Sequence, residues 1–480
     1  MREPALMSAE ELLEQYARRC LDPVDALMAI TERIARYNPT LNAFVVLNQN
    51  AETAAKESAR RWRAGRPLGL LDGVPCTVKD LIDLAGFPTR RGSLITGAEP
   101  VLEDAPCVLG LKAAGAVILG KTTTTEYGWK SPGDCPLTGI TRNPWNPERT
   151  PGGSSAGAAA ACAAGFGPLH IGTDGGGSIR IPAAWSGIVG LKPSFGRVPQ
   201  WPAGAFATVA VAGPLTRTVR DAALLLSAVA RFDDRDPYAL PDDRRDWREG
   251  IEAGVAGLRI AVLQNHGFPA RLDPAGKEAL EEAAQRFRAQ GALVEEVDPH
   301  LPDTRAVFGR LWGIALARLV ASVPVAERKK LDPGLLALAA SQPEMTAAEF
   351  LDAEALRLTT AHRLAALTRS YDLLLCPTVP NPAPLAGAPI KDPAAALWQH
   401  WAPWTFTFNL SRQPAISMPM ALDDTGLPRS VQIAAALYRD DLVLRAARTL
   451  ERTGDILGCA GMAWPAQTER GLVGNTRERS

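Results

Sequence analysis

The spacing of apolar residues near the start of the chain predicts helices. An apolar series that begins at Leu12 follows Ser8 and Glu11, which stand at the spacing of a helix capping box. A second series runs through "DPVDALMAITERI", where Asp22 occupies an N-cap position and Pro23 the first helical position. These patterns predict two amphipathic N-terminal helices that pack against the rest of the molecule.

From about residue 70 the apolar runs become short and stand between glycines and prolines. Four such runs are "GVPCTVKD", "AGAVILGKT", "GPLHIGTD" and "GIVGLKP". Short apolar runs bounded by turn-forming residues are typical of buried strands. Because helical segments separate these runs, the pattern predicts an α/β alternation.

The second half of the chain starts after a polar stretch at residues 232–250, which reads as a surface excursion or a joint between two halves. Beyond it, "GLRIAVLQN" and "ALVEEV" are predicted strands on either side of an Asp-capped helix that ends at Gly291, so together they predict one βαβ unit. A long helix is predicted to follow Thr346, because Glu349 completes another capping box.

Composition excludes several classes of partner. The 480 residues contain 52 Lys+Arg and 52 Asp+Glu, so the formal net charge is zero and no basic face for nucleic acid or anionic lipid is expected. No apolar run approaches the roughly 18–20 residues that cross a bilayer, and the start "MREPALMSAEELLEQYARR" lacks a signal-peptide apolar core. We therefore expect a cytoplasmic protein that binds neither nucleic acid nor membrane.

The cysteines give no sign of a metal site or a disulfide framework. There are seven, at positions 20, 76, 107, 135, 162, 376 and 459, and none forms a CxxC pair. We expect most of them to be buried thiols, and we expect no metal and no cofactor.

Two short motifs invite alternative functions. "GAVILGKT" matches the P-loop pattern and would place Lys121 on a phosphate, but its four intervening residues are apolar and belong in a buried strand. "GSSAG" would make Ser155 the nucleophile of a hydrolase elbow, with His400 as the least implausible base. Such an elbow follows a strand, whereas "TRNPWNPERTPG" is rich in proline and charge, so the sequence disfavours this alternative.

The stretch "GTDGGGSIR" places three glycines directly before Ser178 and just after an apolar run. Successive glycines let backbone N–H groups approach a ligand without a Cβ in the way. Such a turn is suited to hold the oxyanion of an acyl-transfer intermediate.

Three blocks together resemble the signature of the amidase signature family. They are "GVPCTVKD" with Lys79, "RTPGGSSAG" with Ser154 and "GTDGGGSIRIPA" with Ser178, at separations that fit the family without a gap. The similarity continues through "GITRNPWNPERT", "GIVGLKPSFGRVP" and "AGPLTRTVRDAALLL", and more loosely through "PWTFTFNLSRQPAISMP" and "GLPRSVQIAA". The resemblance therefore covers most of the chain.

This resemblance implies that Ser178 is the nucleophile, that Ser154 is a bridging serine held in a cis peptide bond, and that Lys79 is the base. The implied roles are chemically sound. A serine hydroxyl is a weak nucleophile until a base takes its proton, and a lysine can serve only if burial lowers its pKa from about 10.4. Lys79 follows the apolar residues "CTV", which is compatible with burial.

The resemblance also implies an oxyanion hole made of four backbone N–H groups, those of Gly175, Gly176, Gly177 and Ser178. It implies that Asp174 and Arg180 hold this loop and that the backbone at Gly128 faces the substrate. Gly175 departs from the family, whose members usually carry a larger residue such as threonine or isoleucine there; the N–H is retained, but we expect a looser loop.

Substrate preference is predicted from aromatic residues in the segments expected near the site: Trp129, Trp201, Phe206, Trp398, Trp401 and Trp404. Of these, Trp129, Trp201 and Phe206 are the candidate substrate-binding side chains. Such a concentration favours an apolar or aromatic acyl or amine group over a highly charged substrate. Within this family that admits carboxamides, anilides, aryl esters and carbamates (urethanes).

The family fold implied for residues 1–480 is one α/β domain with a large mixed β-sheet covered by helices on both faces. Its parts are N-terminal helices at 1–65, a catalytic core at about 66–230, an excursion at about 250–370 and a return to the core at about 371–465. The expected function is an amidase that forms an acyl-enzyme on Ser178, as a monomer or homodimer. The alternative is the glutaminase-like subunit of a tRNA-dependent amidotransferase.

Overall fold

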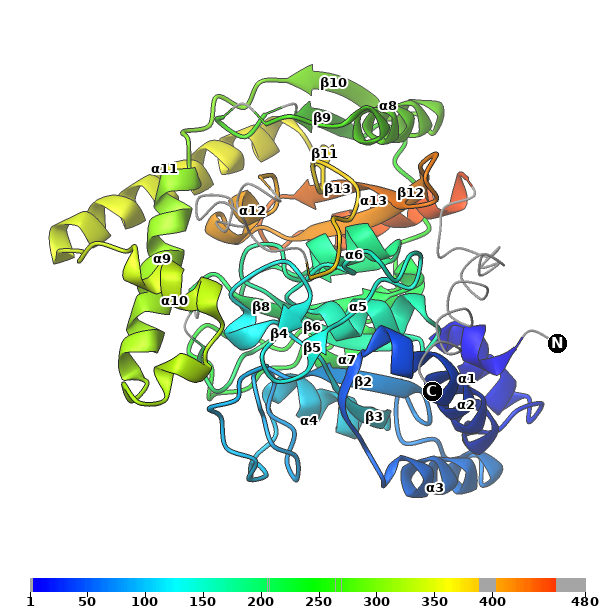
Figure 1. Cartoon of the computed structure of the whole chain (residues 1–480). Helices are drawn as coiled ribbons and strands as arrows, with labels where there is room; N and C mark the ends of the chain where they lie inside the picture. Colours follow the sequence, from blue (N-terminus) through cyan, green and yellow to red (C-terminus); the bar gives the residue numbers. More distant parts are fainter. Residues whose placement is uncertain are drawn as a thin grey trace.

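A computed structural model of the chain describes residues 3–204, 206, 208–263, 265–268, 270–387 and 403–454. The larger sheet in this part of the chain has eleven strands (Figure 1). Across the sheet they follow the order β1 (Phe44–Leu47), β3 (Val117–Thr122), β2 (Pro75–Lys79), β6 (Leu169–Asp174), β8 (Val211–Thr216), β7 (Val189–Lys192), β12 (Ala415–Leu422), β13 (Pro428–Ala435), β11 (Leu373–Pro377), β9 (Arg259–Leu263) and β10 (Leu293–Val297).

Parallel and antiparallel pairs occur in the same sheet. Strand β2 runs parallel to β3 and β6, whereas β8 runs antiparallel to β6 and β7. The four short apolar runs of the first half form β2, β3, β6 and β7, which confirms the predicted strands. The mixed α/β sheet implied by the family resemblance is likewise confirmed.

The predicted βαβ unit is present at one edge of the sheet. Strands β9 and β10 are parallel, and α8 (Pro274–Ala289) joins them after an N-cap at Asp273. Strand β11 pairs with the other side of β9, also in parallel. The second half of the chain therefore extends the sheet of the first half.

The helix starts predicted from capping patterns are confirmed. Helices α1 (Ala9–Ala17) and α2 (Pro23–Leu41) begin at capping boxes on Ser8 and Asp22, and α3 (Ala51–Arg63) follows β1. Helix α11 (Ala347–Ser370) begins after Thr346, which forms a capping box with Glu349. Local polar contacts thus fix these helix ends.

Helices cover both faces of the sheet. Leu169 and Ile171 of β6 lie in one core with α4 (Pro106–Ala113), α7 (Val219–Val229), α8 and α13 (Asp440–Arg452). Gly172 points the opposite way, since side chains alternate along a strand, and a Cβ there would lie 2.7 Å from Ser155 Oγ at the start of α5 (Ala156–Ala163). Helix α6 (Arg180–Ser186) packs beside α5.

A group of helices from the second half lies at one side of the molecule, at the left in Figure 1: α9 (Arg305–Ser322), α10 (Pro333–Ala340) and α11. Helices α1–α3 lie on the opposite side. An apolar cluster joins α9, α10 and α12 (Phe406–Leu410) to Trp129 and Trp185 of the first half. Strands β4 (Asp134–Cys135) and β5 (Gly139–Ile140) form a separate small hairpin.

The polar stretch at residues 232–250, which the structure describes throughout, contains no helix or strand, as the prediction of a surface excursion requires. Trp247 holds it to the core, because its side chain is buried and the guanidinium groups of Arg197 and Arg245 stack on its ring.

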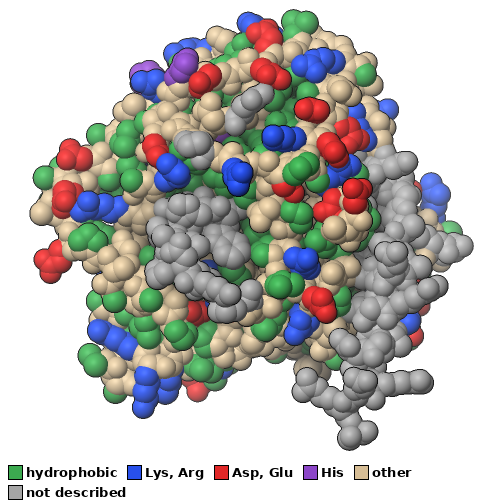
Figure 2. All heavy atoms as spheres, turned by 45° about the horizontal axis from the view of Figure 1, so that its top comes forward, with side chains coloured by type: hydrophobic (Ala, Val, Ile, Leu, Met, Phe, Trp, Pro, Cys, Tyr) green, Lys and Arg blue, Asp and Glu red, His purple; other side chains and the backbone are tan. Residues whose placement is uncertain are grey.

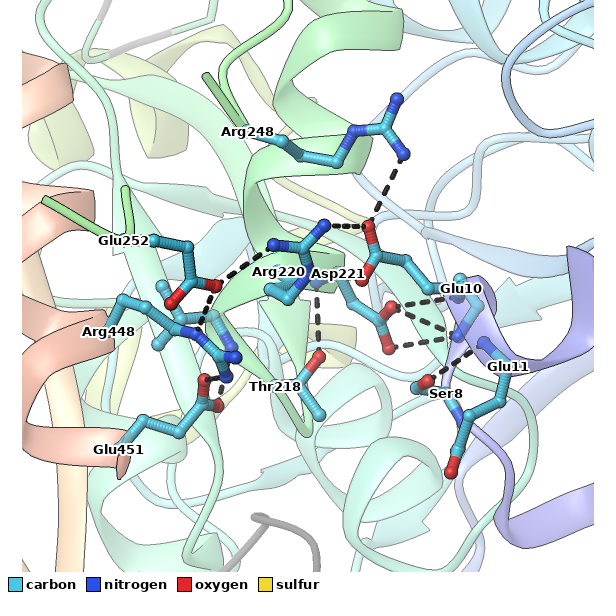
Figure 3. Close-up of polar contacts among 12 residues, drawn as sticks. Ser8, Glu10, Glu11, Thr218, Arg220, Asp221, Arg248, Glu252, Arg448 and Glu451 are labelled. Carbon is cyan, nitrogen blue, oxygen red and sulfur yellow. Dashed lines mark hydrogen bonds and ion pairs between the residues drawn. The ribbon is translucent and has the colours of Figure 1, made fainter. Parts of the chain in front are cut away.

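A network of carboxylates and guanidinium groups ties the first helix to the core (Figure 3). The buried Asp221 carboxylate accepts hydrogen bonds from the N–H groups that start α1, and Ala9 N lies 3.0 Å from each of its oxygens. Glu10 of α1 pairs with Arg220 and Arg248. These contacts bring α1, α7 and residues near 248 together.

The cysteines and the surface agree with the composition. Among the described cysteines, Cys20 is exposed, and five are buried free thiols: Cys76, Cys107, Cys135, Cys162 and Cys376. Positive and negative side chains are interspersed over the face drawn in Figure 2. Within the described residues, none of the helices has the length and apolar character that a membrane span requires.

Candidate active site

Lys79 ends strand β2, between β3 and β6, and its side chain is fully buried. Its Nζ lies 2.8 Å from Ser154 Oγ and 2.9 Å from Thr173 Oγ1. The carbonyl oxygen of Thr173 is farther away, at 3.5 Å from the same nitrogen. The strand end therefore presents an amine to a serine hydroxyl inside the protein.

Burial lowers the pKa of Lys79 well below its ordinary value, and the charge of Asp174 opposes this shift only in part. A lysine with a lowered pKa holds a neutral amine, with a lone pair, at a lower pH than an exposed lysine does. The amine can then accept a proton from a neighbouring hydroxyl.

Ser154 lies in the turn that precedes α5, and only 2% of its surface is exposed. The peptide bond between Gly153 and Ser154 is cis, as the resemblance implied. A Cβ at Gly153 would lie 2.7 Å from the carbonyl oxygen of Ser131, and a Cβ at Gly128 would lie 3.2 Å from Ser154 Oγ. Glycines thus allow two backbone segments to approach this hydroxyl.

Ser178 follows the glycine turn after β6 and is 8% exposed. Its carbonyl oxygen accepts a hydrogen bond of 3.2 Å from Ser155 N, which joins its segment to the Ser154 turn. Gly177 has a φ of +141°, and a Cβ there would lie 2.4 Å from Thr405 Oγ1, so this position requires glycine. The turn therefore carries Ser178 on the side of the sheet that holds Ser154.

Asp174 and Arg180 form a buried ion pair at the base of this turn. The Nη2 and Nε atoms of Arg180 lie 2.9 Å and 3.0 Å from the two carboxylate oxygens. Burial raises the pKa of Asp174, but the charge and hydrogen bonds of Arg180 outweigh burial and hold it at about 2. The pair is therefore ionised at any ordinary working pH.

The hydrogen bonds of Asp174 correct one part of the predicted oxyanion hole. Gly177 N donates to Asp174 Oδ1 at 2.6 Å, so this N–H is already occupied. The N–H groups of Gly175, Gly176 and Ser178 donate no hydrogen bond to another described residue. The sequence showed four N–H groups in a row but not which one the carboxylate of Asp174 takes.

The candidate aromatic residues lie in different surroundings. Phe206 stacks on Trp312 of α9, with ring centroids 3.6 Å apart, beside Gly175. Trp129 is fully buried, and Trp404 is 1% exposed. Trp201 is 41% exposed and lines a surface pocket with Asp83, Val101–Ala105 and Pro202, a set that includes none of the three candidate catalytic residues. Trp398, Trp401 and His400 lie outside the described residues.

The two alternative motifs are explained by packing. Lys121 lies in the buried strand β3, where its Nζ pairs with Asp80 at 2.9 Å and contacts Thr89 Oγ1 at 2.8 Å. Ser155 is buried, and its Oγ donates to the carbonyl oxygen of Thr173 at 3.2 Å. Between Ile140 and the start of α5, a span described without gaps, there is no strand, so the one that a hydrolase elbow requires is absent there.

Several residues that sequence reasoning missed complete the site. Arg180 donates to Thr405 O, Asn409 Oδ1 and Gln432 Oε1, and all three acceptors come from the last quarter of the chain. Gln432 stands in the apolar run "SVQIAA", where a polar residue inside a strand was a usable signal. Trp312 gave no signal in the pattern of its helix.

No group of three or more His, Cys, Asp or Glu side chains placed to hold a metal ion occurs in the part of the chain that the structure describes. The clustered groups of the site are an amine, hydroxyls, backbone N–H groups and one ion pair.

Comparison with known proteins gives a consistent result. A sequence model described as Amidase matches residues 25–444. The chain is 35% identical to an acylamidase of Rhodococcus erythropolis, over 93% of this chain and 95% of that one. It is 32% identical to one of the subunits of the glutamyl-tRNA(Gln) amidotransferase of Pseudomonas fluorescens, over 94% and 98%. A crystal structure of a bacterial aryl acylamidase of the amidase signature family matches with a TM-score of 0.85 and 29% identity, over 98% of each chain.

Proposed function

The chain belongs to the amidase signature family and is an amidohydrolase, and from this membership we propose that it hydrolyses the C–N bond of carboxamides through an acyl-enzyme on Ser178. The observation that carries the proposal is the buried Lys79 amine at 2.8 Å from Ser154 Oγ, in the same site as the glycine turn of Ser178.

In the proposed reaction, Lys79 takes a proton from Ser154 Oγ, which takes one from Ser178 Oγ as this oxygen attacks the carbonyl carbon. Collapse of the tetrahedral intermediate breaks the C–N bond, and the proton returns through Ser154 to the leaving nitrogen. Water then attacks the acyl-enzyme and releases the acid. The Ser178 hydroxyl has no hydrogen bond to another described residue, and catalytic contacts often tighten only once substrate is bound.

Thr173 is suited to orient the amine of Lys79 in this reaction. A neutral primary amine has two N–H donors and one lone pair. Because Thr173 offers both its hydroxyl and its carbonyl oxygen to Lys79 Nζ, the two N–H groups can point to Thr173. The lone pair then faces the hydroxyl of Ser154, which is the direction that proton transfer requires.

The free N–H groups of Gly175, Gly176 and Ser178 would hold the oxyanion of the tetrahedral intermediate. Asp174 supports the turn by accepting the N–H of Gly177, and Arg180 fixes Asp174 in turn. Removing one oxyanion donor typically costs about 10²–10³ in kcat, so this turn must be held in place for catalysis.

We propose substrates with apolar or aromatic groups. Support comes from the aromatic stack of Phe206 and Trp312 beside Gly175, and from the similarity to an acylamidase and an aryl acylamidase. The same acyl-enzyme chemistry would extend to aryl esters and carbamates, because each offers a carbonyl and a leaving group. The roles of Gly128, Trp129 and Trp201 in binding, the cytoplasmic location and a monomeric or homodimeric state stay predictions.

The test is a hydrolysis panel of anilides, primary amides, aryl esters and carbamates. We expect anilides to be cleaved, Ser178→Ala and Lys79→Ala to remove nearly all turnover with the fold intact, and Ser154→Ala to leave a small remnant. Full anilide turnover by Ser178→Ala would refute the assignment.

One relative supports a second function, the glutaminase-like subunit of a tRNA-dependent amidotransferase. Such a subunit uses the same chemistry but passes ammonia to a partner. Glutamine hydrolysis as the dominant activity, together with co-purification of a second subunit, would favour this function. Faster turnover of anilides than of glutamine by the isolated chain would exclude it.

A further inference from the structure

Gly175 is held next to a large side chain from a distant helix. A Cβ at Gly175 would lie 3.2 Å from Cζ3 and 3.6 Å from Cη2 of Trp312 on α9. The backbone of Gly175 does not lie in the left-handed region, so its conformation admits any residue. The space beside it, rather than its backbone, therefore limits what this position can carry.

The ring of Trp312 is fixed on several sides. Its Nε1 donates to the carbonyl oxygen of Trp129 at 3.2 Å, and Phe206 stacks on it at an interplanar angle of 6°. Phe308, one turn earlier on α9, packs near it with ring centroids 5.5 Å apart. Trp312 is only 4% exposed, so it has little freedom to yield to a new Cβ.

The same ring contacts both halves of the site. Gly175 begins the turn that carries Ser178, while Trp129 directly follows Gly128, where a Cβ would meet the side chain of Ser154. Trp312 thus bridges the segments that hold the two serines.

The helix that carries Trp312 is itself clamped to the Trp129 segment. Next to Trp129, Lys130 Nζ pairs with Asp332 Oδ2 at 2.7 Å, and Asp332 caps α10, the helix packed against α9. The backbone N–H of Asp332 also donates to the buried Glu126 carboxylate at 2.6 Å. These contacts hold α9 and α10 at a set distance from the Ser154 side of the site.

We propose that Trp312 is a positioning and specificity-determining residue that takes the volume of a side chain at position 175. It fixes the turn of Ser178, and with Phe206 it forms a flat wall that limits the group beside the scissile carbonyl to small or planar shapes. This inference rests on the proposed attack by Ser178. Phe206, which is partly exposed, offers the ring on which a planar group can stack.

The test is a double-mutant cycle of Gly175→Ala and Trp312→Leu, with acetanilide and the bulkier pivaloyl anilide as substrates. We expect Gly175→Ala to lower kcat/KM for acetanilide about tenfold, because the new methyl group displaces the turn. The double variant should regain activity to at least the level of Trp312→Leu alone. Trp312→Leu should also raise the ratio of pivaloyl to acetyl turnover about tenfold or more.

Trp247→Leu is the matched control, since it also truncates a buried tryptophan but outside the site. It should lower thermal stability without changing the substrate ratio. Trp312→Phe keeps an aromatic ring and should shift the ratio in the same direction by less, which preserves the test if Trp312→Leu fails to fold. Independent losses in the double variant, or a substrate ratio equal to that of the Trp247→Leu control, would overturn the proposal.

Thermal unfolding of the same variants separates this inference from the proposed function. If the wild type cleaves no anilide, or Ser178→Ala retains turnover, the proposed function and the substrate wall fall together. The packing claim is then decided by Tm alone, because Gly175→Ala should be destabilising in the wild type and close to neutral in the Trp312→Leu background.

Discussion

Replacing Arg180 by methionine is a sharp test of how the Ser178 turn is supported. The guanidinium donates five hydrogen bonds inside the core, two of them to Asp174. Methionine keeps much of the length and apolar packing of the side chain but removes every donor. The carboxylate of Asp174 would stay buried with backbone N–H groups and the Asn409 amide as its remaining donors.

Breaking a buried pair from one side costs about 3–5 kcal/mol, because a buried charge is left without its partner. We therefore expect Arg180→Met to lower the free energy of unfolding by that amount near neutral pH. The double variant with Asp174→Asn removes the charge as well and should cost less than Arg180→Met alone. A coupling of about 2 kcal/mol between the two positions is in the usual range for contacting residues.

The pH dependence gives an independent sign. In the wild type the pKa of Asp174 is lowered to about 2, so its stabilising contribution is present above about pH 4 and is lost as the pH falls toward 2. Without Arg180, burial raises the pKa of Asp174 instead. The deficit of Arg180→Met relative to the wild type should therefore shrink as the pH is lowered.

The assay is chemical denaturation followed by tryptophan fluorescence and circular dichroism, at neutral and acidic pH. Arg439→Met is the control, because Arg439 is half exposed and pairs with Asp441 at 3.0 Å, a surface pair worth at most about 1 kcal/mol. The reasoning is refuted if Arg180→Met is no more destabilising than this control, or if the double variant loses the sum of the two single losses.

Three further predictions concern buried polar groups. Thr173→Val removes the hydroxyl beside Lys79 Nζ, so kcat should fall about tenfold with little change in KM, and the acid limb of the pH–rate profile should move to lower pH because the ammonium form loses an acceptor. Asp221 has its pKa raised to about 7 by burial, so it contributes stability below about pH 4 that is lost as the pH rises through 7. The stability of Asp221→Asn should fall less than that of the wild type between pH 5 and pH 8, by about 2–3 kcal/mol, as denaturation at both pH values would reveal. Burial lowers the pKa of Lys192 to about 7, so Lys192→Met should be more stable than the wild type at pH 7, and this advantage should shrink toward pH 10; an unchanged difference across that range would contradict the prediction.

The fold could be predicted from sequence where local patterns decide it. The apolar run before Lys79 and the one that ends at Asp174 are strands because both are short, buried and bounded by turn formers. The capping boxes at Ser8 and Thr346 give the helix starts for the same reason, since each contact spans only three residues.

The partners of the site could not be predicted in this way. Asn409 donates to Asp174 across 235 positions of the chain, and Trp312 donates to Trp129 across 183. No local periodicity specifies such contacts, because they depend on how the second half of the chain packs against the first.

Neighbouring positions in the sequence also misled in one case. Four N–H groups follow one another from Gly175 to Ser178, yet Asp174 takes the third of them. Whether an N–H points to a ligand or to the chain's own carboxylate depends on the turn geometry, which glycine leaves open.

The central claim is that the neutral amine of Lys79 activates Ser178 through Ser154. The most direct measurement is the rate of labelling by a fluorophosphonate probe, with the modified residue located by mass spectrometry, in the wild type and in Lys79→Met. We predict labelling at Ser178 that rises with pH through the pKa of Lys79 and is at least about a hundredfold slower in Lys79→Met. Labelling at Ser155, or an equal rate at Ser178 in both proteins, would contradict the account.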